Sequence, residues 1–352
     1  MRLLFVYKNN NQDPSEKALR QWLPRFVDNY KEYQFRKTQR NRFDPDNLNF
    51  SESFKSSVEK FKPSHIFCWL LYLNPKEIAW CKSLGIKLIA GINGVASFST
   101  GLYKSQSIYF DSLRQLDAFL IPHRPHIPVL IGHGINAVEM PFFYDPEAYY
   151  PLPKIYKRIF KARSDIFFVG NFGDYSKIDA QGAYRKKGIE ILAEFSRVKV
   201  MSSDFVKFKC HLKKVKATGN DWVVNFHANN SRSAICFDYF PDVLVYNKIN
   251  NHMVQYYSDH DKFTIRQRIF TMMGSGLPIF VERHPEIERL FLDGKDIIMW
   301  SNLRDLKSKA SHYLSKPEEL SLIAETGHLK AKLFYTVEKR LIETILPTIF
   351  KL

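Results

Sequence analysis

Short apolar segments alternate with longer amphipathic segments along residues 1–150 of the chain. Segments that are apolar throughout predict buried strands, at 2–7, 65–71, 87–92, 118–122 and 128–132. Helical spacing is found at 15–30 and at 75–85, and the second of these ends on Gly85, a residue typical of helix carboxyl ends. Apolar strands separated by helices indicate a parallel sheet with helices on both faces.

The same alternation restarts after four prolines between 141 and 153, which predict a passage between two domains. Strands are predicted at 165–170, 197–201, 242–247, 277–282 and 296–300. Helices are predicted at 184–195, 264–276 and 284–294, and the end from 303 is helical almost throughout, whereas 200–240 has no clear pattern. We therefore expect an α/β protein with two doubly wound halves, in which ligands bind at the carboxyl ends of the strands.

The composition fits a two-domain globular protein. The chain has 352 residues, and its longest apolar run, Ile66 to Leu73, suits a buried strand and is shorter than the roughly 20 residues of a bilayer span. The first residues read as a strand and not as a secretion signal. Four scattered cysteines form no C-x-x-C pair, so we expect neither disulfides nor a zinc ribbon, and a cytoplasmic protein.

The net charge of +16 is unevenly distributed. Residues 151–216 contain 16 Lys and Arg against 6 Asp and Glu, so ten of the sixteen excess charges lie there. One interpretation is an ordinary solvated surface. The other is a surface that faces anions, such as nucleotide phosphates, an acidic acceptor or anionic lipid.

One motif follows the predicted strand at 165–170. Gly170, Asn171 and Gly173 form a turn whose backbone N–H groups could receive a pyrophosphate. The basic residues downstream, which could contact the same phosphates, are Arg185, Lys186 and Lys187. The alternative is a tight strand-to-helix turn without a ligand. Neither a Walker A loop nor a G-x-G-x-x-G fingerprint is found in the sequence.

A second motif, RQRIFTMMGSGLPIFVE at 266–282, predicts a helix, a glycine turn and a buried strand. Arg268 could meet a phosphate and Thr271 a sugar. The turn itself consists of Gly274, Ser275 and Gly276. An ordinary helix end followed by a proline would have the same spacing, so the spacing leaves both interpretations open.

RIFTMMGSGLPIF, followed by PEIERLFLDGKDIIMW and ASHYLSKPEELSLIAETG, resembles the C-terminal half of GT-B glycosyltransferases. The similarity is greatest to the spore-maturation-protein type, which is related to the group-1 glycosyltransferases. DIFFVGNFGDY, DVLVYNKIN and GHGINAVEMPFFYDPEAYYP extend it, so that it covers about 125–335. The resemblance implies two Rossmann-like domains that face across a cleft. It assigns 1–150 to the acceptor, 151–335 to the donor, and 336–352 to a helix that packs back on the N-terminal domain.

The resemblance also implies the site. By this resemblance, Arg268 and the turn at Gly274–Gly276 hold the diphosphate and sugar of the donor. The loop Gly170–Gly173, together with Arg185 or Lys187, holds the diphosphate from the facing side. The donor-binding residues expected on this basis are Gly170, Asn171, Gly173, Arg185, Lys187, Asn247, Arg268, Thr271, Gly274, Ser275 and Gly276.

The chain departs from the family pattern at three positions. Thr271 and Phe263 stand where many members have glutamates, and Asn93 stands where many have a histidine close to the anomeric carbon. Asparagine cannot act as a general base but can hydrogen-bond a sugar hydroxyl. The catalytic candidates are therefore Asn93 and His133. The other residues that could supply a base are His123, Asp117 and His65, and the stereochemistry stays open.

Metal chemistry is not expected. The D-x-D segments at 44–46 and 259–261 read as loops, and GT-B enzymes stabilise the leaving diphosphate with helix ends and basic side chains. We expect a metal-independent transferase of polysaccharide biosynthesis, cytoplasmic or peripheral at the inner membrane face. It would take a nucleotide-sugar donor and a cell-surface glycan, lipopolysaccharide or lipid-linked acceptor. The alternatives are a phage-type DNA-modifying glycosyltransferase and a non-catalytic nucleotide-sugar-binding protein.

Overall fold

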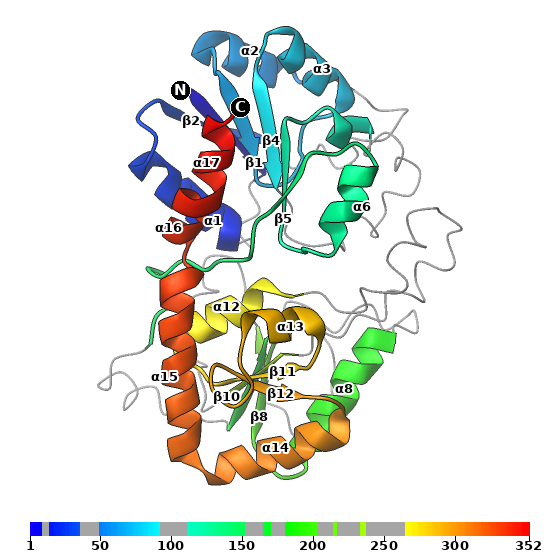
Figure 1. Cartoon of the computed structure of the whole chain (residues 1–352), viewed down its shortest axis with the longest axis vertical. Coiled ribbons are helices and arrows are strands. Elements are labelled where there is room, and N and C mark those ends of the chain that lie inside the picture. The colour runs from blue at the N-terminus through cyan, green and yellow to red at the C-terminus, as the bar shows by residue number, and fades with distance from the viewer. Residues whose placement is uncertain are drawn as a thin grey trace. The chain divides into compact units, whose positions relative to one another are not determined.

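The computed structural model describes residues 1–8, 14–35, 49–91, 111–151, 165–169, 180–202, 214–216, 233–236 and 265–352. The chain divides into two compact units (Figure 1). Unit 1 consists of Met1–Phe143 and Val337–Leu352, and unit 2 consists of Tyr144–Thr336. The end of the chain therefore folds together with its beginning.

Unit 1 contains a six-stranded sheet in the order β2-β1-β3-β4-β5-β6, in which every pairing is parallel. The strands are β1 (Leu3–Lys8), β2 (Tyr30–Phe35), β3 (His65–Cys68), β4 (Lys87–Gly91), β5 (Ala118–Ile121) and β6 (Ala137–Glu139). The helices are α1 (Pro14–Trp22) with a 3-10 turn (Leu23–Arg25), α2 (Glu52–Phe61), α3 (Pro75–Ser83) and α6 (His126–Gly132). After unit 2 come α16 (Val337–Arg340), a π-helical turn (Leu341–Ile345) and α17 (Leu346–Phe350).

One core cluster of unit 1 joins the two ends of the chain. Leu3 and Phe5 of β1 are fully buried, and they belong to the same cluster as Leu19 of α1. The C-terminal helices add residues at every fourth position to this cluster: Val337, Leu341, Ile345 and Ile349. This spacing keeps one face of the helical segment on the sheet, which explains why the last residues belong to unit 1.

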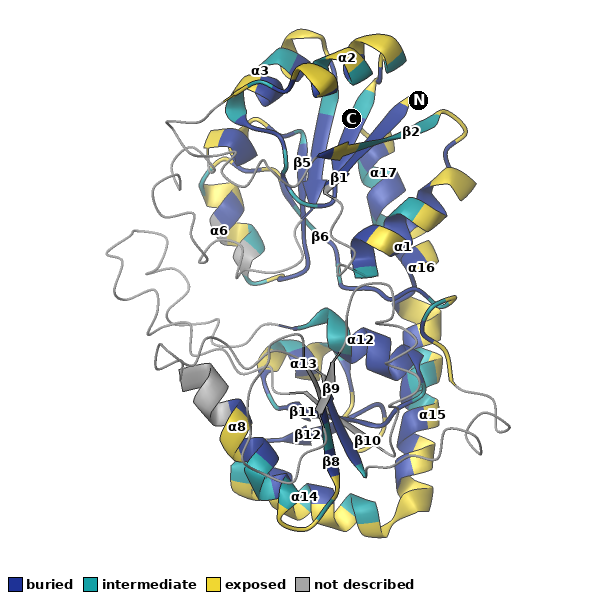
Figure 2. Ribbon diagram, turned by 180° about the vertical axis from the view of Figure 1, so that it is seen from behind, coloured by how far each residue is buried: buried dark blue, intermediate teal, exposed yellow. Residues whose placement is uncertain are grey.

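Unit 2 contains a second parallel six-stranded sheet, in the order β12-β11-β10-β7-β8-β9. Its strands are β7 (Ile166–Val169), β8 (Val198–Ser202), β9 (Lys214–Lys216), β10 (Ser233–Cys236), β11 (Ile279–Glu282) and β12 (Ile298–Trp300). Its helices are α8 (Ala180–Ala193), α12 (Gln267–Gly274), α13 (Pro285–Leu290), α14 (Leu303–Ser315) and α15 (Pro317–Phe334). Figure 2 shows α12 largely buried and the outer turns of α14 and α15 exposed.

These sheets confirm the predicted α/β class. One predicted strand is wrong, because 128–132 belongs to helix α6. A run of five apolar residues is too short for its periodicity to distinguish the two states. The helix predicted for 15–30 ends early, since Pro24 lies in the 3-10 turn and Tyr30 already begins β2. The strand predicted at 242–247 lies outside the described residues, and β10 occupies the region without a clear pattern.

Within the described ranges, no helix is both long enough and apolar enough to cross a lipid bilayer.

Candidate functional site

The strand order reverses once in each sheet. In unit 1 the chain moves from β1 to β2 on one side and continues from β3 on the other, so the reversal lies between β1 and β3. In unit 2 it moves outward from β7 to β9 and returns to β10 on the other side of β7. Ligands of open parallel sheets bind outside the carboxyl ends of the strands at such points. Each unit therefore has one candidate site.

Arg268 lies at the candidate site of unit 2. It is on the first turn of α12, and its guanidinium carbon is 6.0 Å from the centre of the Phe168 ring on β7. Phe168 is the last but one residue of β7, so the cation lies near the carboxyl end of that strand. The predicted turn with Gly170, Asn171 and Gly173 follows β7 directly in the chain and lies outside the described residues, as does Asn247. The structure thus places the predicted arginine beside the strand that leads into the predicted phosphate turn.

The basic residues of α8 have different environments. Arg185 is buried, with 6% of its surface exposed, whereas Lys187 is exposed. Lys186 lies 3.7 Å from Glu190 in an exposed i,i+4 pair, which contributes little to stability. The phosphate contacts predicted for Arg185 and Lys187 stay predictions, and Arg185 is the one whose charge water screens least.

The carboxyl end of α12 is capped by its own side chains. The Thr271 hydroxyl donates to Arg268 O at 3.0 Å, and the Ser275 hydroxyl donates to Thr271 O at 2.9 Å. The backbone N–H of Gly276 donates to Met273 O at 2.9 Å. These bonds satisfy backbone carbonyl groups that would otherwise have no hydrogen-bond partner within the helix. Each hydroxyl oxygen still has acceptor capacity, so the donor contacts predicted for Thr271 and Ser275 stay predictions.

The two glycines of the turn have structural roles that need no ligand. A Cβ atom on Gly274 would lie 2.3 Å from Cε2 of the Tyr144 ring, far inside contact distance. Gly276 has a φ of +71°, which favours glycine, and a Cβ there would lie 3.0 Å from Pro151. Close packing and a left-handed helix end therefore account for both residues. Their contact with a donor stays a prediction.

Helix α15 holds α12 from the other side. Gly327 lets α15 approach the 291–296 loop so closely that a Cβ would lie 2.4 Å from Asp296 O. The next residue, His328, donates from Nδ1 to Met273 O at 3.3 Å. Burial lowers the pKa of His328 more than its backbone hydrogen bonds raise it, which favours the neutral ring. The end of α12 is thus fixed by residues about 55 positions later in the chain.

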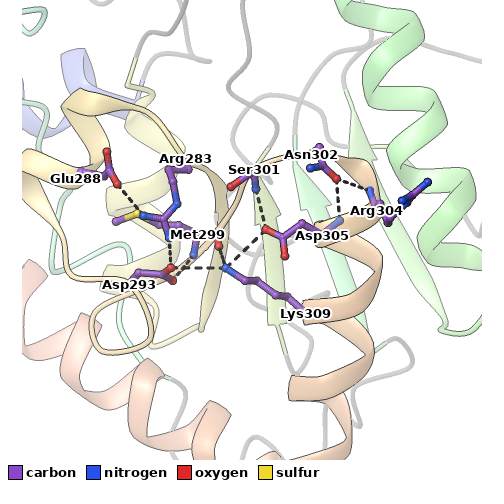
Figure 3. Close-up of polar contacts among 9 residues, drawn as sticks. All are labelled: Arg283, Glu288, Asp293, Met299, Ser301, Asn302, Arg304, Asp305 and Lys309. Atoms are coloured by element: carbon purple, nitrogen blue, oxygen red, sulfur yellow. Dashed lines mark hydrogen bonds and ion pairs between the residues drawn. The ribbon is translucent and has the colours of Figure 1, made fainter.

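A network of charged side chains joins the segments that follow β11 and β12 (Figure 3). Arg283 donates to Glu288 at 2.7 Å and also to Asp293. Asp293 in turn accepts from the backbone N–H of Met299 at 2.7 Å and lies 3.5 Å from Lys309 of α14. The network fixes the carboxyl ends of both strands. The sequence pattern does not mark these residues, since charged loop residues have no periodicity.

The candidate site of unit 1 contains a buried carboxylate that no sequence motif marks. Glu16 lies in the first turn of α1, and only 3% of its surface is exposed. Its Oε2 accepts a hydrogen bond of 2.9 Å from the hydroxyl of Tyr72, in the connection after β3. The pair joins the carboxyl ends of β1 and β3, where the strand order reverses. Acidic residues are common in first helical turns, so the sequence pattern alone does not mark this one.

The residues considered as bases lie at opposite edges of the unit 1 sheet. His133 follows the end of α6 and precedes β6, which places it at the amino edge, where its carbonyl accepts from Arg114 Nε at 2.8 Å. His65 is the first residue of β3, and Asp117 directly precedes β5, so both lie at the same edge. The place of His133 argues against the catalytic role predicted for it, because ligands bind at the other edge.

His123 lies at the carboxyl edge, two residues after β5. It is buried, and its ring centre is 5.8 Å from that of Phe142. Asn93 follows β4 by two residues and lies outside the described residues. Position in the sheet therefore favours His123 among the four residues considered as bases.

No group of three or more His, Cys, Asp or Glu residues that could hold a metal occurs among the residues the structure describes. The segments 44–46 and 259–261 lie outside them, so metal independence stays a prediction.

Comparisons with known proteins agree with this architecture. A model of the family described as "Glycosyl transferase-like" matches residues 201–346. A search of curated protein sequences found no significant match. Sucrose-phosphate synthase from Thermosynechococcus elongatus is a similar solved structure, with a TM-score of 0.66 and 11% identity over 99% of this chain and 100% of that one.

Two further solved structures are similar to the whole chain. HepE from Anabaena, solved with UDP and glucose, has a TM-score of 0.67 and 12% identity over 100% of both chains. The lipopolysaccharide outer core galactosyltransferase WaaB has a TM-score of 0.55 and 10% identity over 100% of this chain and 99% of that one. These likenesses show the GT-B fold with two Rossmann-like domains. The chain therefore has this fold, and its residues 201–346 are similar to the glycosyl transferase-like family.

Proposed function

We propose that the chain transfers a sugar from a uridine diphosphate sugar, bound in unit 2, to a glycan or lipid-linked acceptor bound in unit 1. The observation that carries the donor site is Arg268 at the carboxyl end of β7, beside the reversal of strand order. The similar HepE structures include one with UDP and one with UDP-glucose. WaaB acts, by its name, on the outer core of lipopolysaccharide, and it supports an acceptor of that class.

In the proposed reaction the acceptor oxygen forms a bond to the anomeric carbon, and the bond from that carbon to the diphosphate breaks. The leaving diphosphate gains negative charge, and cations fixed in advance at that place lower the barrier. Arg268 is the cation proposed for this task, because its guanidinium can form two parallel hydrogen bonds to phosphate oxygens. Lys187 on α8 is proposed as a second one. We propose that these side chains make a metal unnecessary.

Thermal unfolding in the presence of nucleotides tests the donor site. A ligand that binds only the folded protein stabilises it by about 2.7 kcal/mol at a hundredfold excess over its Kd. For a unit of this size, about 2.7 kcal/mol corresponds to a rise in Tm of roughly 5–10 °C. We expect UDP to produce such a rise, with GDP, ADP and CMP producing less. Arg268→Ala removes the rise.

Arg197→Ala is the matched control. Arg197 pairs with Asp165 at the amino edge of the same sheet, and its side chain is 66% exposed. The variant should therefore keep the full response to UDP. A UDP response that survives in Arg268→Ala, or is lost equally in Arg197→Ala, would contradict the proposed donor site. The absence of any response to UDP in the wild type would contradict the proposed donor itself.

We also propose that the protein works at an anionic membrane surface. The excess of ten positive charges in 151–216 supports this, because basic segments are attracted to anionic lipid by about 1 kcal/mol per residue. Co-sedimentation with vesicles that contain phosphatidylglycerol, compared with retention on duplex DNA at equal salt, separates this partner from nucleic acid. Binding to DNA alone would instead favour the DNA-modifying alternative.

A further inference from the structure

Helix α15, which lies along the edge of unit 2 in Figure 1, has leucines on its solvent face as well as a buried apolar face. The buried residues of α15 are Leu320, Ile323, Ala324, Gly327 and Ala331. Leu322, Leu329 and Leu333 are instead 65%, 51% and 57% exposed. They are seven and then four positions apart, which places them within about 40° around the helix axis and opposite the buried face. These three residues form a leucine stripe.

The leucine stripe is unusual for a helix on the surface of a domain. Such a helix normally has polar residues opposite its buried face. The neighbouring helix α14, all of which the structure describes, follows this rule. Its exposed residues are Arg304, Lys307, Ser308, Ser311, His312 and Ser315. Single exposed leucines are common, but leucines aligned on one face form a continuous apolar patch, which is the usual sign of a binding surface.

The charges beside the leucine stripe change sign along α15. Its acidic residues, Glu318, Glu319 and Glu325, are all exposed and lie in its first half. Lys332, near its end, is exposed as well. A second copy of α15 that lay parallel to the first would place like charges side by side. An antiparallel copy would instead place Glu318 beside Lys332 of the second copy. The charge pattern therefore favours an antiparallel pair of identical helices.

One twofold axis brings both the leucines and the charges together. If the axis passes between Glu325 and Thr326, Leu322 and Leu329 are equally far from it, so each faces the other in the second copy. Glu318 and Lys332 are also equally far from it, to within one residue. The same axis brings the two copies of Glu325 close together, and this repulsion weakens the pair.

We propose that two copies of the chain associate through the leucine stripe of α15, antiparallel about this twofold axis. This association goes beyond the proposed function and is independent of the donor site. The helix has 18 residues and is about 27 Å long, so one helix pair buries less than the roughly 1,200–2,000 Å² of a stable interface. We therefore expect a reversible dimer with a Kd in the micromolar range.

Sedimentation equilibrium of the full chain measures this association. We expect the mass to rise from 41.4 kDa toward twice that value as the protein concentration increases. Leu329→Gln removes an apolar contact twice in each dimer and should raise the Kd by about ten- to a hundredfold. Leu84→Gln is the matched control, because Leu84 is 53% exposed and belongs to unit 1, and it should leave the Kd unchanged. Both substitutions are at exposed positions, so the Tm of the monomer should stay the same.

Exchange of charges tests the antiparallel arrangement. Glu318→Lys and Lys332→Glu each place like charges opposite each other twice in a dimer, and each should raise the Kd by about four- to thirtyfold. An equimolar mixture of these two variants should again form a dimer about as tightly as the wild type, because every such contact then joins a lysine to a glutamate. Glu325→Gln removes the repulsion at the axis and should lower the Kd by about twofold.

Several results would overturn the proposal. One is a wild type that stays monomeric up to about 200 µM, where a micromolar dimer would form. Another is a dimer whose Kd does not change in Leu329→Gln, which would use a different surface. A mixture of the two charge variants that stays monomeric contradicts the antiparallel pair. Weaker binding of Leu329→Gln to phosphatidylglycerol vesicles, in a chain that is always monomeric, would assign the leucine stripe to a lipid surface instead.

Discussion

Gly274→Ala tests the explanation of the glycine turn. The added Cβ would lie 2.3 Å from Cε2 of Tyr144, whereas ordinary contacts begin at 3.4 Å, so ring and helix must separate by about 1.1 Å (3.4 minus 2.3). Tyr144 is 1% exposed, and its backbone N–H is bonded to Tyr335 O at 2.9 Å, which leaves the ring little room to move. Such overpacking costs about 1–3 kcal/mol, and the better helix propensity of alanine returns at most about 1 kcal/mol. The expected loss of stability is therefore about 1–2 kcal/mol.

Calorimetry or circular dichroism on heating measures this loss. For a unit of this size, about 1–2 kcal/mol lowers the Tm by roughly 2–8 °C. Gly132→Ala is the matched control, because Gly132 is also the last residue of a helix and a Cβ there meets nothing within 4 Å. It should be neutral or slightly stabilising. Because α12 also carries Arg268, we expect Gly274→Ala to weaken the response to UDP as well.

A double-mutant cycle with Tyr144→Leu decides whether the ring is the cause. Tyr144→Leu alone leaves a cavity and destabilises by about 2–4 kcal/mol. In that background Gly274→Ala should cost less, since Cε2 and Cζ of the ring, two of the three atoms that the added Cβ meets, are gone. An equal loss in both backgrounds would refute the packing explanation of Gly274.

Two further predictions concern stability. Burial alone would raise the pKa of Asp117, but hydrogen bonds from Lys82 and the Leu88 N–H outweigh it and lower the pKa. Asp117→Asn should therefore cost about 1–2 kcal/mol of stability at pH 7, and this difference is present above about pH 4 and closes as the pH falls through the folded pKa. Urea unfolding at several pH values measures it, and a difference that does not change with pH would contradict the prediction. Gly327→Ala places a Cβ 2.4 Å from the backbone oxygen of Asp296, so we expect the free energy of unfolding to fall by about 2 kcal/mol or more in the same assay. Unchanged stability would contradict this prediction.

The sequence was informative where the signal is local. Apolar runs at 2–7, 65–71 and 277–282 predicted strands because burial on both faces leaves few polar positions in a central parallel strand. The end of helix α12 was also predicted, since a glycine turn followed by proline stops a helix wherever it occurs. The resemblance of the C-terminal half agrees with the comparisons, in which a glycosyl transferase-like family model matches residues 201–346 and the solved structures share the fold.

The secondary structure of residues 128–132 decides at which edge of the sheet His133 lies. Five apolar residues fit a strand or a helix, and the choice decides which edge of the sheet the following residue reaches. As a helix, the segment returns the chain to the amino edge, so His133 lies at the edge opposite the carboxyl ends of the strands, and its catalytic role stays a prediction. His123, which no pattern distinguished, lies at the carboxyl edge because β5 ends two residues earlier.

The sequence by itself determined the α/β class, the helix end at Gly274–Gly276 and the glycosyltransferase resemblance. Only the tertiary structure decided that Tyr144 covers Gly274, that Arg268 reaches the end of β7, and that Glu16 meets Tyr72 where the strand order reverses. The physical reason is that periodicity along a chain specifies which side of an element is buried. It does not specify which distant element covers that side, because strand order depends on how all the elements pack together.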